Sequence, residues 1–235
     1  MKTAITFLLE EYADWEGAYI TSTLNQNEGW QNKTASIQSE VTSIGGLKTK
    51  IDYLIEQIPE KIDLFIMIGG NSWDIENHHL YLIIDKFLKT GVPVAAICGA
   101  VDYLAQSGLL QGYKHTGMRN YLLESENYHN KEDFIEQQAV KDHNLITANG
   151  TAPIEFTDLI LQAVHFETEE TRQKRFVYTN LDTMITIKST ENLSPKHSLQ
   201  LDTLINVVTS NSNNDCLSHF LWYLLKKIHS IYVHY

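Results

Sequence analysis

The chain has 235 residues, of which 43% are hydrophobic, and this is enough to bury one large core or one core with an appendage. Its formal net charge of -11 argues against nucleic acid and membrane surfaces as partners, because neither offers a counter-charge to an acidic protein. A small-molecule substrate or a protein partner fits this composition better.

Apolar stretches of strand length alternate with amphipathic stretches of helix length through the first two thirds of the chain. This alternation is typical of a mainly parallel sheet between helices, a three-layer α/β sandwich of the flavodoxin-like kind. We expect strands at residues 3–9, 34–38, 62–68, 94–98 and 145–148, and helices at residues 15–24, 51–58, 75–89, 101–110 and 153–166. Glycine pairs and an Asn-Gly pair mark the turns, at Gly45-Gly46, Gly69-Gly70 and Asn149-Gly150.

Neither the N-terminus nor the cysteine content indicates export. The apolar run from Ala4 to Leu9 ends at Glu10, so it is too short for a signal-peptide core or a membrane span. Cys98 and Cys216 lie far apart, without the spacing of a disulfide framework or a thiolate zinc site. We therefore expect a soluble protein in a reducing cytoplasm.

Beyond residue 167 the composition changes to stretches typical of linkers: a highly charged helical stretch at residues 167–175, a polar loop-like stretch at 189–198 and a run of Ser, Asn and Asp at 210–215. Residues 217–231 then place leucines and isoleucines at helical spacing, which predicts an amphipathic helix that must be covered. The cover is either the core of the same chain or a partner subunit. We expect an α/β domain at residues 1–167 and a partly helical C-terminal extension at residues 168–235.

Cys98 is the most informative residue. It stands between a buried strand and a helical pattern that begins after Gly99, so it falls at a strand-to-helix turn. The free N–H groups and the positive dipole end of a helix N-terminus favour a thiolate, which predicts a lowered pKa for Cys98. The position indicates a nucleophile or a redox sensor. A small buried cysteine that fills a strand end is the alternative.

Five segments, in chain order, carry a resemblance to a known family. They are Asp14-Trp15-Glu16-Gly17, Gly69-Gly70, Ala95-Ala96-Ile97-Cys98-Gly99-Ala100, Ser107-Gly108-Leu109-Leu110-Gln111-Gly112-Tyr113-Lys114-His115-Thr116, and the strand, turn and helix at residues 145–164. Residues 1–167 resemble the DJ-1/PfpI superfamily, the single-domain branch of the class I glutamine amidotransferase-like fold. Relatives of this kind often form homodimers, so we expect a homodimer here.

The resemblance implies roles for three further residues. Glu16 stands where the family has an acid that reaches the cysteine, and a protonated carboxyl group there would stabilise a thiolate. An exposed acid in the first turn of a helix is the alternative. The N–H groups of Gly70 and Gly99 are the expected oxyanion donors, because main-chain donors at a turn are pre-oriented. A turn that only lets the backbone bend is the alternative for the glycine pair.

The third partner of the cysteine is where this chain departs from the better-known relatives. Some relatives have a histidine directly after the cysteine, where this chain has Gly99, and others have one where this chain has Met118-Arg119-Asn120. His115 is the nearest substitute, and as a base it would take the thiol proton. A structural or solvated loop histidine is the alternative.

Trp15 and Trp73 follow strand ends, where open α/β sheets bind ligands, so both are candidates to line a small pocket near Cys98. Core packing is the alternative for both. The other histidines show no HExxH-like spacing, so we expect no metal site and no cofactor.

Two classes of function use the same cysteine. The first is a cysteine-dependent hydrolase or amidotransferase-like enzyme that acts on a small amide, an ester or a reactive carbonyl, with Cys98 as nucleophile and Glu16 and His115 moving protons. The second is a non-hydrolytic stress-response protein, a redox sensor or a chaperone-like protein, in which Cys98 is oxidised to sulfenic or sulfinic acid. A third possibility is an interaction module that works through the C-terminal helix.

Overall fold

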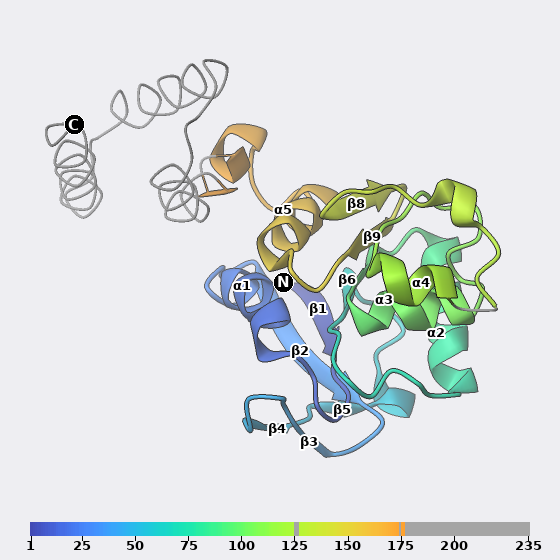
Figure 1. Ribbon diagram of the computed structural model, residues 1–235. Coiled ribbons are helices and arrows are strands. Elements are labelled where there is room, and N and C mark those ends of the chain that lie inside the picture. Colours follow the sequence, from blue (N-terminus) through green and yellow to red (C-terminus); the bar gives the residue numbers. More distant parts are fainter. Residues whose placement is uncertain (125–126, 174, 177–235) are drawn as a thin grey trace, which may run out of the picture. The chain divides into compact units, whose positions relative to one another are not determined.

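Seven strands form one sheet in the order β5-β2-β1-β6-β7-β9-β8 of the computed structural model (Figure 1). All neighbours in it are parallel except β8 and β9. The strands are β1 (Lys2–Phe7), β2 (Trp30–Ser36), β5 (Tyr53–Leu54), β6 (Leu64–Met67), β7 (Val94–Ile97), β8 (Ala139–Asp142) and β9 (Leu145–Ala148).

Helices cover both faces of this sheet. On one face α1 and α5 lie side by side, and on the other lie α2 and α3, with α4 next to α3 (Figure 1). Their bounds are α1 (Asp14–Asn25), α2 (His78–Thr90), α3 (Gly99–Gln106), α4 (Arg119–Glu124) and α5 (Pro153–Ala163). The predicted three-layer α/β sandwich with a mainly parallel sheet is confirmed.

The central strands are apolar throughout because both of their faces are buried. In β6, Phe65 and Met67 pack on the α2–α3 side, whereas Leu64 and Ile66 pack on the α1–α5 side. Successive side chains of a strand point to opposite faces, so one continuous apolar run contributes to two cores. This is why the sequence shows runs here rather than an alternating pattern.

The helix expected at residues 51–58 is wrong. The segment contains β5 and the short 3-10 helix η1 (Ile55–Gln57), and a hairpin of β3 (Glu40–Thr42) and β4 (Lys48–Lys50) comes before it. Tyr53 pairs with Ala35 of β2, and Pro59 follows the segment. A residue before proline is disfavoured in the α region, and sheet pairing outweighs the weak helical pattern.

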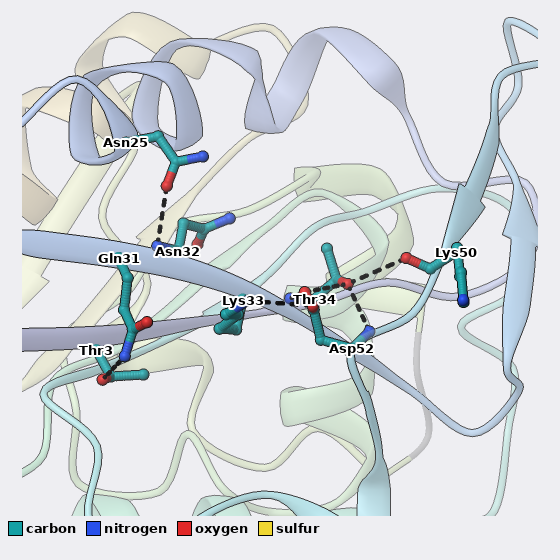
Figure 2. A network of polar contacts seen from close by, with 8 residues as sticks. All are labelled: Thr3, Asn25, Gln31, Asn32, Lys33, Thr34, Lys50 and Asp52. Atoms are coloured by element: carbon teal, nitrogen blue, oxygen red, sulfur yellow. Dashed lines mark hydrogen bonds and ion pairs between the residues drawn. The ribbon is translucent and has the colours of Figure 1, made fainter.

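Side chains protect the outer edge of β2, which β5 covers only at its C-terminal end (Figure 2). The N–H of Asn32 donates to Asn25 Oδ1 at 3.1 Å, and the N–H of Thr34 donates to Asp52 Oδ2 at 2.9 Å. Exposed edge N–H groups otherwise invite another strand to pair. These bonds satisfy the edge within the chain itself.

The structure describes residues 1–124, 127–173 and 175–176, all within one compact unit, Met1–Asn180. Residues 169–173 are helical, and Arg172 of this segment forms ion pairs with Asp158 of α5 and with Glu169. The predicted linkers at residues 189–198 and 210–215 and the helix at residues 217–231 lie outside the described residues, and the predicted domain boundary stays a prediction. No helix in the described part of the chain is long and apolar enough to cross a membrane.

Candidate active site

Four loops meet at one edge of the sheet. The strands β1, β6, β7 and β9 are parallel neighbours, so the segments that follow them emerge together at their carboxyl ends. In open α/β sheets this edge is where ligands bind. The segments carry Glu16, Gly69-Gly70, Cys98 and Gly150.

Cys98 adopts a backbone conformation that non-glycine residues rarely occupy, with φ 57° and ψ -129°. Its N–H donates to Ala148 O at 3.0 Å, and its carbonyl accepts from the N–H of Val101 at 2.8 Å. These bonds tie the residue to β9 on one side and to α3 on the other. A strained strand-to-helix turn of this kind is known from nucleophile elbows, where it exposes the reactive atom above the sheet.

Glu16 lies in the first turn of α1 and is fully buried, at 0% exposure. Its Oε2 accepts the N–H of Gly69 at 2.9 Å, and the Gly69 carbonyl in turn accepts the N–H of Ala13 at 3.0 Å. The loop before α1 is thus held against the glycine pair, which places the carboxyl group inside the site. The alternative of an exposed acid does not hold.

The second oxygen of Glu16 faces the thiol. A Cβ atom built on Gly150 would lie 3.0 Å from Glu16 Oε1 and 2.9 Å from Cys98 Sγ. Oε1 is buried and has no hydrogen-bond partner of regular geometry among the described residues. The thiol of Cys98 interacts with this carboxyl group. Burial raises the pKa of Glu16, and the interaction with the thiol acts in the opposite direction. Glycine at position 150 therefore leaves the space in which the two groups meet.

Burial raises the pKa of Glu16 to about 7. Burial, together with the negative charge of Glu16, raises the pKa of Cys98 to about 12, against the opposing hydrogen bond from the Gly99 N–H. The predicted lowering of the Cys98 pKa is therefore wrong in direction. Loss of solvent and the neighbouring carboxylate outweigh the dipole of a short helix.

The two groups form a coupled pair, so their protons belong to the pair rather than to either residue. When Glu16 is protonated, the proton sits on Oε1, because Oε2 already faces an N–H donor. A proton on Oε1 points toward the sulfur. Glu16 is thus placed to take the thiol proton and to give it back.

Asp102, a residue that the sequence reasoning missed, adds to the negative field. It lies in the first turn of α3, burial raises its pKa to about 6, and its charge contributes to the raised pKa of Cys98. The signal was its spacing of four residues from Cys98, which puts both on one side of a helix.

The glycines of the site are needed for close approach. Gly70 has φ 145°, and a Cβ on it would lie 2.3 Å from Glu11 O. A Cβ on Gly99 would lie 2.8 Å from Gly70 O. The Gly70 N–H has no acceptor among the described residues, and the Gly99 N–H interacts with the Cys98 sulfur. Their part as oxyanion donors, which the resemblance implies, stays a prediction.

The two tryptophans lie in different surroundings. Trp15 is 51% exposed, and its Nε1 donates to Gly150 O at 3.3 Å, so it stands at the rim of the site. Trp73 is buried behind the elbow, donates to Ile68 O at 2.9 Å and packs on Phe7. Trp73 therefore belongs to the core that supports the elbow, and its edge touches the site through Gly99, whose Cβ position lies 3.1 Å from Trp73 Cδ1.

His115 is fully buried among aromatic rings. Its Nδ1 lies 2.7 Å from Tyr113 O, and its Nε2 lies 2.5 Å from the hydroxyl oxygen of Tyr128. A carbonyl oxygen only accepts, so Nδ1 carries the proton and Nε2 accepts from Tyr128. Burial lowers the pKa of His115, in keeping with a neutral ring. Both ring nitrogens thus form hydrogen bonds with tyrosines, one with a main-chain carbonyl and one with a hydroxyl group. The catalytic role of His115 stays a prediction.

Within the part of the chain that the structure describes, no group of three or more His, Cys, Asp or Glu side chains is placed to hold a metal ion. The residues that do converge at the sheet edge are a thiol, a carboxyl group and main-chain N–H groups. This set suits nucleophilic addition to a carbonyl carbon, with a proton donor at hand.

Residues 2–163 match the DJ-1/PfpI family. The protein named "Uncharacterized protease YdeA" of Bacillus subtilis is 48% identical over 181 residues, which are 77% of this chain and 91% of that protein. "Uncharacterized protease YoaZ" of the same organism is 33% identical over 168 residues, 66% of this chain and 80% of that protein.

Solved structures of the same superfamily are similar in fold. The DJ-1 superfamily protein Atu0886 from Agrobacterium tumefaciens has a TM-score of 0.72 and 27% identity, and the match covers 78% of this chain and 100% of that one. A thiJ/pfpI family protein from Bacillus anthracis has a TM-score of 0.71 and 29% identity, over 86% of this chain and 97% of the other.

Proposed function

The chain belongs to the DJ-1/PfpI family, and from that premise we propose that it is a cysteine-dependent hydrolase of a small amide, an ester or a reactive carbonyl compound. Two relatives that carry the name protease support a hydrolytic reaction. One observation carries the proposal, namely that the buried carboxyl group of Glu16 directs its unpartnered oxygen toward the space it shares with the sulfur of Cys98.

The reaction begins with a proton transfer. The thiol of Cys98 gives its proton to Glu16 Oε1, and the thiolate adds to the carbonyl carbon of the substrate. A C–S bond forms, and the electron pair of the C=O π bond moves to oxygen. Because Glu16 becomes neutral in this step, the site never holds two adjacent negative charges.

The developing oxyanion needs fixed donors. The N–H groups of Gly70 and Gly99 are assigned to this part, since the backbone of a tight turn and of a helix start is pre-oriented. The Gly70 N–H has no competing acceptor among the described residues.

With an amide or an ester, the leaving group departs with the proton that Glu16 holds. The carbon–nitrogen or carbon–oxygen bond breaks, and the amine or alcohol leaves while the acyl group stays on Cys98. Water then adds to the thioester, Glu16 takes its proton, and Cys98 leaves as the thiol when that proton returns. Glu16 therefore serves as base and acid in turn.

The test measures turnover of simple esters, simple amides and methylglyoxal by the full chain, by Cys98→Ser and by Glu16→Gln, with Cys216→Ser as the matched thiol control. We expect turnover in the full chain and in Cys216→Ser, and its loss in the other two variants. Absence of turnover of every substrate by the full chain, or unchanged turnover in Cys98→Ser, contradicts the proposal.

A redox role is the second candidate, and the partial exposure of Cys98 favours it, because an oxidant needs access to sulfur. A proton on Glu16 Oε1 would also hydrogen-bond to a sulfinate oxygen. Peroxide treatment followed by intact mass measurement distinguishes this role. Oxygen additions that persist in Cys98→Ala contradict it, whereas additions that vanish support it.

A further inference from the structure

We propose that the groove beside Cys98 binds the carboxylate of an anionic substrate through Arg119, with Glu136 as the group that the substrate displaces. The inference rests on the proposed function, because it names the substrate class of the same cysteine site. The groove has a volume of about 300 Å³, and Arg119, Phe134, Glu136, Asn149 and Thr151 are among the residues that line it.

The groove and the cysteine site share one turn of the chain, residues 149–151. Asn149 and Thr151 line the groove, and the residue between them is Gly150, whose Cβ position lies 2.9 Å from Cys98 Sγ. The same turn therefore forms one wall of the groove and one wall of the cysteine site. A molecule bound in the groove lies against the turn that also borders the thiol.

Arg119 follows a loop that the core holds firmly. The N–H of Thr116 donates to Thr147 Oγ1 at 2.9 Å, and Thr116 Oγ1 donates to Gln137 O at 2.7 Å. Gly117 packs so closely that a Cβ there would lie 2.6 Å from Leu122 Cδ1. The backbone that leads to Arg119 is thus fixed on β9 and on α4.

The guanidinium group of Arg119 is partly prepared for an anion. Its Cζ lies over the ring of Phe134, 5.8 Å from the centroid, and it forms an ion pair with Glu136. The aromatic ring covers one face of the guanidinium, which limits its hydration and leaves its edge for a carboxylate. A planar guanidinium binds a carboxylate through two parallel hydrogen bonds.

Glu136 holds this position only weakly. Its side chain is 76% exposed and that of Arg119 is 52% exposed, and ion pairs open to water contribute little to stability. A substrate that is already held at Cys98 presents its carboxylate at high local concentration, so it can replace Glu136. Glu136 in the meantime neutralises the guanidinium.

The charge of the chain makes Arg119 decisive for such a substrate. The formal net charge is -11, and Glu16 and Asp102 lie at the cysteine, so the site as a whole repels anions. Arg119 is the one Lys or Arg among the described residues that line the groove. An anionic substrate therefore depends on this side chain.

The test compares two disulfide reagents on the full chain carrying Cys216→Ser. Dithiobis(nitrobenzoate) carries a carboxylate on each half, and dithiodipyridine is neutral. In both reactions the Cys98 thiolate attacks one reagent sulfur, a protein–reagent S–S bond forms, and the other half leaves as a thiolate or thione. The measured quantity is the ratio of the anionic to the neutral reaction rate.

We expect Arg119→Gln to lower this ratio about tenfold, the range of a lost hydrogen bond to a charged group, Arg119→Lys to retain part of it, and Glu136→Gln to raise it. Lys89→Gln is the control for net charge. Lys89 lies at the end of α2 that leads into the start of β7, and Cys98 follows the opposite end of that strand.

Three outcomes separate the two proposals. An unchanged ratio in both Arg119→Gln and Glu136→Gln overturns the groove inference while the reactive cysteine stands. An equal change in Lys89→Gln also overturns it, because the effect is then one of net charge. No reaction of Cys98 with the neutral reagent overturns the proposed function, and the groove inference with it.

Discussion

Glu16 Oε1 and Cys98 Sγ border the same small space, 3.0 Å and 2.9 Å from the position that a Cβ atom on Gly150 would occupy. Burial removes the water that would otherwise stabilise a charge on either group. The consequence is a pair whose first proton leaves near neutral pH and whose second leaves only at high pH. Reactivity of the sulfur then depends on where the remaining proton sits.

The first prediction concerns stability. The pKa of Glu16 is about 7 in the folded chain, against an ordinary value of 4.5, so the folded state holds a proton that the unfolded state releases between these values. The contribution of this group to the free energy of unfolding is fully present below pH 4.5. It is lost as the pH rises through 7, and the total loss is about 3 kcal/mol at most. Glu16→Gln is uncharged, so it keeps its stability at high pH.

Urea unfolding at pH 5 and pH 8 measures the effect. We expect the free energy of unfolding of Glu16→Gln to exceed that of the parent chain at pH 8, and the difference to shrink at pH 5. A variant that is less stable than the parent at both pH values would show that the Glu16 carboxylate stabilises the fold.

The second prediction is steric. Gly150→Ala puts a methyl group 2.9 Å from Cys98 Sγ and 3.0 Å from Glu16 Oε1, and something must move. We expect at least a tenfold loss of turnover and a changed alkylation rate at Cys98. Gly46→Ala is the control, because Gly46 has φ 83° and open space around it, so it tests backbone strain without a clash. Equal losses in the two variants would refute the steric account.

The third prediction concerns His115, whose two ring nitrogens are bonded to Tyr113 O and to the Tyr128 hydroxyl. Tyr128→Phe leaves the buried Nε2 without a donor, which costs about 1–3 kcal/mol of stability. Burial lowers the pKa of His115 from 6.5, so the unfolded chain takes up the proton first, and stability falls as pH drops below 6.5.

Two measurements on Tyr128→Phe distinguish a structural role of His115 from a catalytic one. They are thermal unfolding at pH 7 and the rate of Cys98 alkylation. We expect the melting temperature to fall and the rate at Cys98 to stay the same. A stable variant with a strongly reduced rate would instead assign His115 to the reaction, as the sequence predicts.

The fourth prediction concerns the edge of β2. Asp52→Ala frees the N–H of Thr34 at an exposed edge, which we expect to cost about 0.5–1.5 kcal/mol and to promote association through that edge. Asp85→Ala is the control, since it removes only an exposed pair with Lys89 on α2. Denaturant unfolding and light scattering measure both effects, and equal behaviour of the two variants would mean that the edge needs no protection.

The sequence predicted the sheet because the central strands are continuous apolar runs with glycine turns after them. The sequence did not predict β8 or the hairpin β3–β4, and it wrongly predicted a helix at residues 51–58, where the structure has β5 and η1. These elements are short and polar, and their form depends on pairing with distant strands rather than on a local pattern. Tertiary contacts decided them.

At the site, the strand-to-helix turn in the sequence located Cys98, and the resemblance to the DJ-1/PfpI superfamily located Glu16. The sequence predicted a lowered pKa for Cys98, since a helix N-terminus is visible in the sequence whereas burial is not. The sequence also could not predict that Gly150 borders the site, because only the packed structure shows that a Cβ atom there would contact both Cys98 Sγ and Glu16 Oε1.

The central claim is that Cys98 and Glu16 share a proton, and the rate of Cys98 alkylation as a function of pH tests it most directly. The chain carries Cys216→Ser, and Glu16→Gln is compared with it. We predict a rise in rate with a midpoint about pH 7 in the parent chain and the absence of this step in Glu16→Gln. Superimposable profiles, each with a single midpoint near that of an ordinary thiol, about 8.5, would contradict it.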